Sequence, residues 1–127
     1  GSGGTFTGVA KYLKEKDSSI KAILADPEGS TLGGGTEEHG YAIEGIGNDF
    51  LPDTMDLKLV DKVIKVNDEE AFLLVKDLAK KEGLIVGSSS GAALAAVLKL
   101  ADTIDRGNIV TIFPDRGDRY FSKNLYE

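Results

Sequence analysis

The sequence predicts an α/β protein in which a parallel sheet is flanked by helices on both faces. Short apolar segments alternate with amphipathic ones along the chain, which is the pattern of strands joined by crossover helices that cover the sheet. The 127 residues are enough for one domain with its own core, and 41% of them are apolar against 28% charged.

Each segment is assigned from its periodicity and from the residues at its ends. In chain order we expect a helix over 6–16, a strand over 20–25, a loop over 28–40, a strand over 63–66, a helix over 68–82, a strand over 84–86, a helix over 92–101 and a strand over 109–113. The four expected strands are predicted to be parallel, because a helix separates most of them.

The helix predicted over 68–82 has the clearest end signals. Asn67 can accept a hydrogen bond from a backbone N–H of the first turn, and the acidic residues at 68–70 complement the positive end of the helix dipole. Gly83 follows the last expected helical residue and ends the helix. The acidic stretch is therefore predicted to be a solvated helix start.

Composition excludes several classes of function. The 15 Lys and Arg residues against 21 Asp and Glu give a net charge of −6, which argues against a nucleic-acid or anionic-membrane partner. The absence of cysteine excludes disulfides and thiolate zinc sites and is compatible with a cytoplasmic location. The single histidine, His39, has no accompanying ligands, so we expect no metal. No apolar run approaches the roughly 20 residues that span a bilayer.

The chain opens with Gly1-Ser2-Gly3-Gly4-Thr5, directly before the first expected helix. Gly-Ser at this position is typical of the remnant of a cleaved tag. A glycine loop before a helix is equally typical of a phosphate site, where backbone N–H groups and the positive helix end hold the anion. Such loops normally follow a strand, so this second interpretation implies a strand upstream. The opening alone does not decide between the two.

A second glycine-rich turn contains Gly87, Ser89 and Gly91 at the spacing of a nucleophile elbow. An esterase would place its acid and then its histidine after the serine, but His39 precedes it. We therefore do not expect a hydrolase. The serines at 88–90 could simply cap the following helix, which is compatible with a ligand role.

A third glycine pair, Gly45 and Gly47, flanks Ile46. Glycines at these positions permit close approach of the backbone to a ligand or an unusual backbone dihedral angle. Taken alone, the segment is better explained as an ordinary turn.

Taken together, the motifs resemble one family across essentially the whole chain. They are Gly1-Ser2-Gly3-Gly4-Thr5, Asp26-Pro27-Glu28-Gly29-Ser30, Glu44-Gly45-Ile46-Gly47-Asn48-Asp49-Phe50, Gly87-Ser88-Ser89-Ser90-Gly91 and Pro114-Asp115. Their order and spacing are similar to those of the cystathionine β-synthase and cysteine synthase family. The resemblance implies the tryptophan synthase β-subunit-like architecture (fold type II), pyridoxal 5′-phosphate as cofactor, and a cytoplasmic lyase or transferase of transsulfuration or cysteine biosynthesis.

The resemblance also implies roles for individual residues. The cofactor-binding residues would be Gly1, Ser2, Gly3, Gly4 and Thr5 around the phosphate, Ser89 at the pyridine nitrogen, and Pro114 and Asp115 near the same end of the ring. The substrate-binding residues would be Glu44, Gly45, Ile46 and Gly47, with Glu44 close to homocysteine.

Within the family, two motifs, Asp26–Ser30 and Glu44–Phe50, are more similar to cystathionine β-synthase. The stretch 115–120 is equally similar to cysteine synthase. The favoured reaction therefore joins serine or O-acetylserine to homocysteine to give cystathionine. The alternative is formation of cysteine from O-acetylserine and sulfide.

The family's Schiff-base lysine and its substrate-carboxylate loop belong to an amino-terminal half with no counterpart in this sequence. We therefore expect residues 1–127 to be the carboxy-terminal part of a β-replacement catalytic domain, with no catalytic residue of its own and no activity without the other half. The parent enzyme is expected to be a homodimer that acts on small amino acids. A second hypothesis is a non-catalytic fold fragment or binding module.

Overall fold

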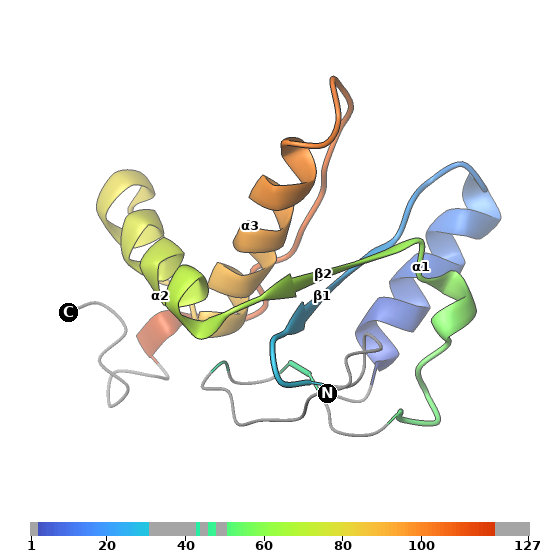
Figure 1. Ribbon diagram of the computed structural model, residues 1–127, viewed down its shortest axis with the longest axis horizontal. Helices are drawn as coiled ribbons and strands as arrows, with labels where there is room; N and C mark the ends of the chain where they lie inside the picture. The colour runs from blue at the N-terminus through green and yellow to red at the C-terminus, as the bar shows by residue number, and fades with distance from the viewer. Residues whose placement is uncertain (1–2, 31–42, 44–45, 48–50, 119–127) are drawn as a thin grey trace.

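The structure is a computed structural model that describes residues 3–30, 43, 46–47 and 51–118. Its elements are, in order, α1 (Gly4–Lys16), β1 (Ile23–Pro27), the 3-10 helix η1 (Leu57–Leu59), β2 (Lys62–Val66), α2 (Asp68–Asp77), the π-helix η2 (Leu78–Glu82) and α3 (Ser88–Ala101). The two strands lie at the centre, with α1 on one side and α2 and α3 on the other (Figure 1). None of the described helices is long and apolar enough to cross a membrane.

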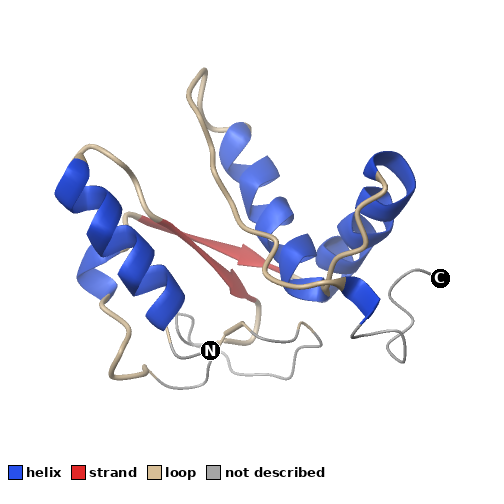
Figure 2. Cartoon of the chain, turned by 180° about the vertical axis from the view of Figure 1, so that it is seen from behind, coloured by secondary structure: helices blue, strands red, loops and turns tan. Residues whose placement is uncertain are grey.

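The two strands are parallel, in a register that runs from Ile23 opposite Lys62 to Pro27 opposite Val66. Successive side chains of a strand point to opposite faces, so the pair contributes to two cores. The larger core lies against α2 and α3 and includes Ile23, Ala25, Ile64, Val66, Ala71, Ala92 and Ala95. The smaller core lies against α1 and includes Phe6, Leu24, Met55, Val60 and Val63. Helices cover both faces of a parallel sheet, as Figure 2 shows from behind, and the predicted fold class is confirmed.

Residues close together in the sequence determine where α2 begins and where the helix ends. Asn67 accepts a hydrogen bond from the backbone N–H of Glu70 at 2.8 Å, and its own N–H donates to Glu70 Oε1 at 2.7 Å. This reciprocal pair is a capping box, which satisfies two N–H groups at the helix start. The helix continues through η2 and ends at Gly83, whose φ of 69° lies in the left-handed region that glycine favours. The predicted helix over 68–82 is therefore confirmed.

The expected strands over 84–86 and 109–113 are wrong. The first contributes only an antiparallel bridge between Val86 and Arg116, and the second has no strand structure. Val110 is 90% exposed. An apolar extended segment becomes a strand only when another strand offers it hydrogen bonds, and no such partner lies beside 109–113 among the described residues.

The bounds of four elements also differ from expectation, and β2 differs least, because it begins at Lys62, one residue early. The first strand is Ile23–Pro27 instead of 20–25, so its end includes the proline. Helix α1 begins at Gly4, two residues early, and α3 begins at Ser88, four residues early. The residue that caps α3 is Gly87, which makes no side-chain capping bond. The serines at 88–90 thus form the first turn of α3 and are not its cap. Most of the expected loop over 28–40 lies outside the described residues.

Candidate functional site

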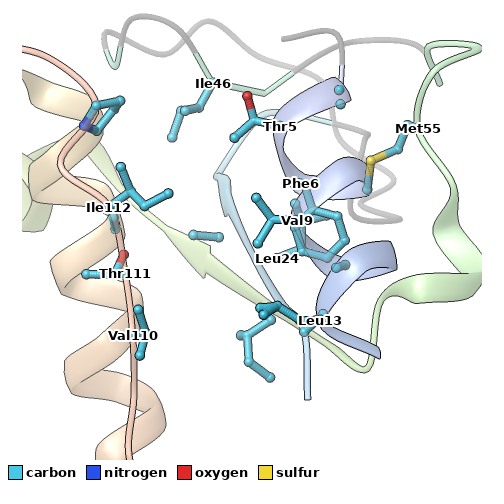
Figure 3. A pocket seen from close by; sticks show the side chains of 18 of the residues that line it. Thr5, Phe6, Val9, Leu13, Leu24, Ile46, Met55, Val110, Thr111 and Ile112 are labelled. Carbon is cyan, nitrogen blue, oxygen red and sulfur yellow. The ribbon is translucent and has the colours of Figure 1, made fainter. Parts of the chain in front are cut away.

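A cavity of about 440 Å3 lies between α1, β1 and the extended segment that returns along α3 (Figure 3). Residues from four of the sequence motifs line it: Gly3, Gly4, Thr5, Ile46, Gly47, Ser89 and Pro114. Small-molecule sites in proteins typically measure about 300–1,000 Å3. The structure therefore brings together motifs that lie far apart in the sequence, in a space large enough for a cofactor.

One end of the cavity is formed by the amino-terminal end of α1. Gly3 is the N-cap residue of the helix, with φ +79°, and as a glycine it makes no side-chain capping bond. The N–H groups of a first helical turn have no intrahelical acceptor, and the helix dipole makes this end positive. Thr5 lies at the same end, beside Ile46 (Figure 3). This end can therefore hold an anion. Gly1 and Ser2 lie outside the described residues.

Ser89 places a hydroxyl at the wall of the cavity from the first turn of α3. The residue is only 8% exposed, and it belongs to the lining of the cavity. A serine hydroxyl at such a wall can both donate and accept a hydrogen bond. Ser89 is therefore suited to bond a ligand in the cavity.

Gly91 has a packing role. A Cβ at this position would lie 2.1 Å from the carbonyl oxygen of Ala71 in α2. Only glycine therefore permits the observed approach of α3 to α2. This contact accounts for the last glycine of the Gly-x-Ser-x-Gly spacing without a nucleophile, and His39, which an esterase would need, lies outside the described residues.

Pro114 lines the cavity, whereas Asp115 does not. The Asp115 carbonyl oxygen accepts a hydrogen bond from Gly87 N at 3.4 Å, and Gly117 N donates to the Ile85 carbonyl oxygen at 2.9 Å. These bonds attach the segment after Pro114 to the turn that precedes α3. The backbone of Asp115 thus contributes to the position of Ser89, while the predicted contact of Asp115 with the ring stays a prediction.

Ile46 and Gly47 form a third part of the wall. Ile46 also packs against the core between the sheet and α3, and Gly47 adopts φ +79°. The packing of Ile46 against this core attaches the wall to the sheet. Glu44 and Gly45, the other two predicted substrate contacts, lie outside the described residues.

Most of the remaining lining is apolar, with Lys14, Lys21 and Thr111 as its polar members, and none of it was predicted as part of the site. Figure 3 shows Phe6, Val9 and Leu13 of α1 on one side and Val110 and Ile112 on the other. Periodicity identified these residues as helix and strand positions. It could not show that the two segments face each other across a gap.

The Asp26–Ser30 motif does not line the cavity but closes the end of β1. Lys65 of β2 donates to Asp26 Oδ2 at 2.5 Å and to the Ser30 carbonyl oxygen at 2.8 Å. Asp26 is only 1% exposed, so the lysine compensates a carboxylate that is shielded from water. No group of three or more potential metal ligands occurs among the residues the structure describes.

Comparison with curated proteins identifies relatives along the full chain. An O-acetylserine dependent cystathionine beta-synthase of Bacillus subtilis is 55% identical over all of this chain and 41% of its own length. A cysteine synthase of Helicobacter pylori is 51% identical over 99% of this chain and 41% of its own length. The chain thus spans about two fifths of these relatives. A mouse cystathionine beta-synthase is 45% identical over 98% of this chain and 23% of its own length.

Solved structures are similar in fold as well as in sequence. An O-acetylserine dependent cystathionine beta-synthase from Helicobacter pylori superposes with a TM-score of 0.92 at 50% identity, over all of this chain and 42% of the other. A hydrogen sulfide-producing enzyme gives a TM-score of 0.89 at 39% identity, over 98% of this chain and 38% of the other. The family model described as "Pyridoxal-phosphate dependent enzyme" matches residues 1–115. The chain therefore belongs to the family of pyridoxal-phosphate dependent enzymes.

Proposed function

We propose that residues 1–127 are the carboxy-terminal part of a β-replacing catalytic domain and that they hold the phosphate and the ring nitrogen of pyridoxal 5′-phosphate. The observation that carries this proposal is the convergence of Gly3–Thr5, Ile46–Gly47, Ser89 and Pro114 on one cavity. The cavity volume, the helix end at Gly3 and the mostly buried Ser89 on the wall fit the cofactor. When bound, the cofactor supplies an electron sink for charge that develops on the substrate.

The first turn of α1 would bind the phosphate. Its N–H groups would donate hydrogen bonds to the phosphate oxygens, and the dipole of α1 would add an attraction for their negative charge. The Thr5 hydroxyl can donate a further bond, because Thr5 lines the same end of the cavity. These contacts would orient the ring toward α3.

Ser89 would bond the ring nitrogen. A serine hydroxyl keeps its proton on Oγ, whereas a carboxylate at this position would favour a protonated ring nitrogen. An unprotonated ring is a weaker electron sink. This favours β-elimination and replacement over transamination.

The wall at Ile46–Gly47 would limit the space for the second substrate. Ile46 presents an apolar side chain to the cavity, and Gly47 allows the backbone to come close to a ligand. Both would exclude water from the reacting carbon. Glu44, next to this wall in sequence, is the residue we propose for contact with homocysteine.

For the substrates, we propose serine or O-acetylserine and homocysteine, with cystathionine as product. The B. subtilis relative, 55% identical, carries a name that states O-acetylserine dependence and cystathionine formation. The H. pylori relative named cysteine synthase, 51% identical, favours the alternative of O-acetylserine and sulfide. An experiment is therefore needed to decide whether the enzyme prefers homocysteine or sulfide as its second substrate.

The test uses the full-length enzyme and its Glu44→Gln variant. We expect kcat/KM for homocysteine to exceed that for sulfide in the unmodified enzyme. The variant should lose homocysteine activity and keep sulfide activity, because sulfide is too small to use a contact at the wall. A higher kcat/KM for sulfide in the unmodified enzyme would favour cysteine synthesis, and absence of an absorbance change with pyridoxal 5′-phosphate would refute the cofactor site.

The rest of the enzyme would complete the sheet and supply the catalytic lysine. A second cavity, of about 950 Å3, extends along the same gap and is lined by Ile23 and Ala25 of β1 and by Val110 and Thr111. The gap thus separates an edge of β1 from an extended, exposed segment. A strand that leads into Gly3 and runs parallel to β1 would fit there, with α1 as its crossover helix. The proposed homodimer and cytoplasmic location stay predictions.

A further inference from the structure

Thr7, the fourth residue of α1, joins the helix to a segment far along the chain. Its Oγ1 accepts a hydrogen bond from Asp56 N at 3.1 Å and donates to Met55 Sδ at 3.7 Å. Its own backbone N–H donates to the Gly3 carbonyl oxygen at 2.9 Å. Thr7 therefore connects the residue that opens α1 to positions 55 and 56.

Met55 lies directly against the glycine that opens α1. A Cβ at Gly3 would be 2.6 Å from Met55 Cβ and 2.9 Å from Met55 Sδ. Met55 is only 6% exposed, and it packs in the small core with Leu24 and Phe6. The turn at Gly3 is thus supported by a side chain that the core holds in place.

The backbone around Asp56 is fixed independently of Thr7. Met55 N donates to the Pro52 carbonyl oxygen at 3.0 Å, and the Asp56 side chain accepts from Lys58 N at 3.0 Å. The second bond caps η1. The Asp56 N–H is therefore presented in a set direction. Because it occupies one lone pair of the Thr7 hydroxyl, the hydroxyl proton is directed to Met55 Sδ.

We propose that Thr7, supported by Met55, is a positioning residue for the cofactor phosphate. It would act by holding the Gly3–Thr5 turn in the conformation that presents N–H groups to the phosphate, without contacting the phosphate itself. The turn needs such support because Gly3 has φ +79° and glycine loses much conformational freedom when it is ordered. Preorganisation of a site raises affinity by removing that cost from the binding step. The inference rests on the proposed phosphate site.

The experiment compares two probes on the full-length apoenzyme: pyridoxal 5′-phosphate and pyridoxal, which lacks the phosphate. We expect Thr7→Val to weaken binding of pyridoxal 5′-phosphate about three- to tenfold, the effect of losing one to two hydrogen bonds. Binding of pyridoxal should be unchanged. Thr7→Ser keeps the hydroxyl and should restore most of the affinity. The readout is the ratio of the two dissociation constants, followed by absorbance.

Two further variants control the result. Thr103→Val removes a threonine hydroxyl that donates to the Leu100 carbonyl oxygen at 2.7 Å, and it should leave the ratio unchanged because Thr103 does not line the cofactor cavity. Met55→Leu keeps the volume but removes the sulfur acceptor, and it should weaken binding of pyridoxal 5′-phosphate less than Thr7→Val does. If Thr7→Val fails to fold, Met55→Leu tests the inference through the same ratio of dissociation constants.

An unchanged ratio in the folded Thr7 and Met55 variants would overturn the inference. An equal loss of affinity for both probes would also overturn the inference, because it would mean that Thr7 stabilises the fold in general and not the phosphate site. Failure of the proposed function is a different outcome: the unmodified enzyme would then bind pyridoxal 5′-phosphate no better than pyridoxal.

Discussion

The two faces of the sheet differ in how completely the described residues cover them. On the α2–α3 face, Val66, Ala71 and Ala92 are fully buried, and the helices approach so closely that Gly91 has no room for a Cβ. On the α1 side, Val9 and Leu13 remain partly exposed beside the cavity, and Val110 across it is almost fully exposed. The first face has a closely packed core, and its Ile23 and Ala25 also border the gap beside β1. The second combines a core around Leu24 with an apolar gap that also holds the candidate site.

This difference indicates where stability and function lie. Close packing on the α2–α3 face gives Ser89 a rigid base, because its helix cannot shift without disturbing the Ala71 contact. The open side has space for a ligand and for the further part that we propose for the enzyme. We therefore expect substitutions on the two sides to have separable effects.

The largest expected effect comes from separating residues 1–127 from the rest of the enzyme. Isolated, this part should self-associate, bind a dye for exposed apolar surface and form neither cystathionine nor cysteine. About 400 Å2 of uncovered apolar surface corresponds to roughly 10 kcal/mol of lost burial, comparable to the net stability of a domain. Sedimentation and dye fluorescence would measure this. A monomer with a cooperative thermal transition would contradict it.

Next in size is Gly91→Ala on the closed face of the full-length enzyme. The new Cβ would lie 2.1 Å from the Ala71 carbonyl oxygen, so α3 must move, at a cost of about 1–3 kcal/mol in the free energy of unfolding. The matched control is Gly8→Ala in α1, where a Cβ meets nothing within 4 Å. It should stabilise by about 0.5–1 kcal/mol, because alanine is the better helix former. Denaturant titration measures the free energy of unfolding of both variants. Equal changes in the two variants would contradict the expected difference between the two helices.

Two neighbouring serines in the first turn of α3 differ in their position relative to the cavity. Ser89 lines the cavity, whereas Ser90 is fully buried and its hydroxyl has no partner among the described residues. Ser89→Ala should slow β-elimination about three- to tenfold, by loss of one hydrogen bond to the ring, while the cofactor stays bound through its phosphate. Ser89→Asp should protonate the ring and change reaction specificity.

Ser90→Ala is the control for these variants. It removes an unsatisfied buried hydroxyl, so stability should be unchanged or higher and turnover unaffected. Steady-state kinetics together with thermal melts test this pair. If Ser90→Ala slowed turnover as much as Ser89→Ala, the specific role of Ser89 would be lost.

The smallest effect concerns pH on the outer edge of the α1 side. A hydrogen bond from Lys14 and another from Ala22 N lower the pKa of Asp61 below its ordinary value of 3.8. A lowered carboxyl pKa stabilises the fold above the unfolded value, and this contribution disappears as the pH falls through the folded value. The stability difference between the unmodified enzyme and Asp61→Asn should therefore be constant near neutral pH and shrink below about pH 3.8.

Asp105→Asn is the control for the pH experiment, because it removes the same charge from an exposed position. This change leaves the ion pair between Lys14 and Asp61 in place. Denaturant titrations across the acid range would measure both variants. Identical pH profiles would contradict the proposed role of the Lys14 contact.

Features that depend on neighbours in the chain could be predicted from the sequence. Asn67 and Glu70 are three residues apart and form the predicted helix start, and Gly83 ends the helix where its freedom at positive φ is needed. The order of the motifs also indicated which residues belong to one site. Such signals are readable because capping bonds and turns involve atoms within a few residues of each other.

Only the tertiary structure decided the rest. The apolar run over 109–113 has the composition of a strand, but strand formation needs a partner that the described residues do not supply. The start of α3 at Ser88, the absence of Asp115 from the cavity lining and the contact of Thr7 with Met55 likewise depend on packing between distant segments. No local pattern encodes such contacts, because the chain brings these residues together only when the sheet and its helices have formed.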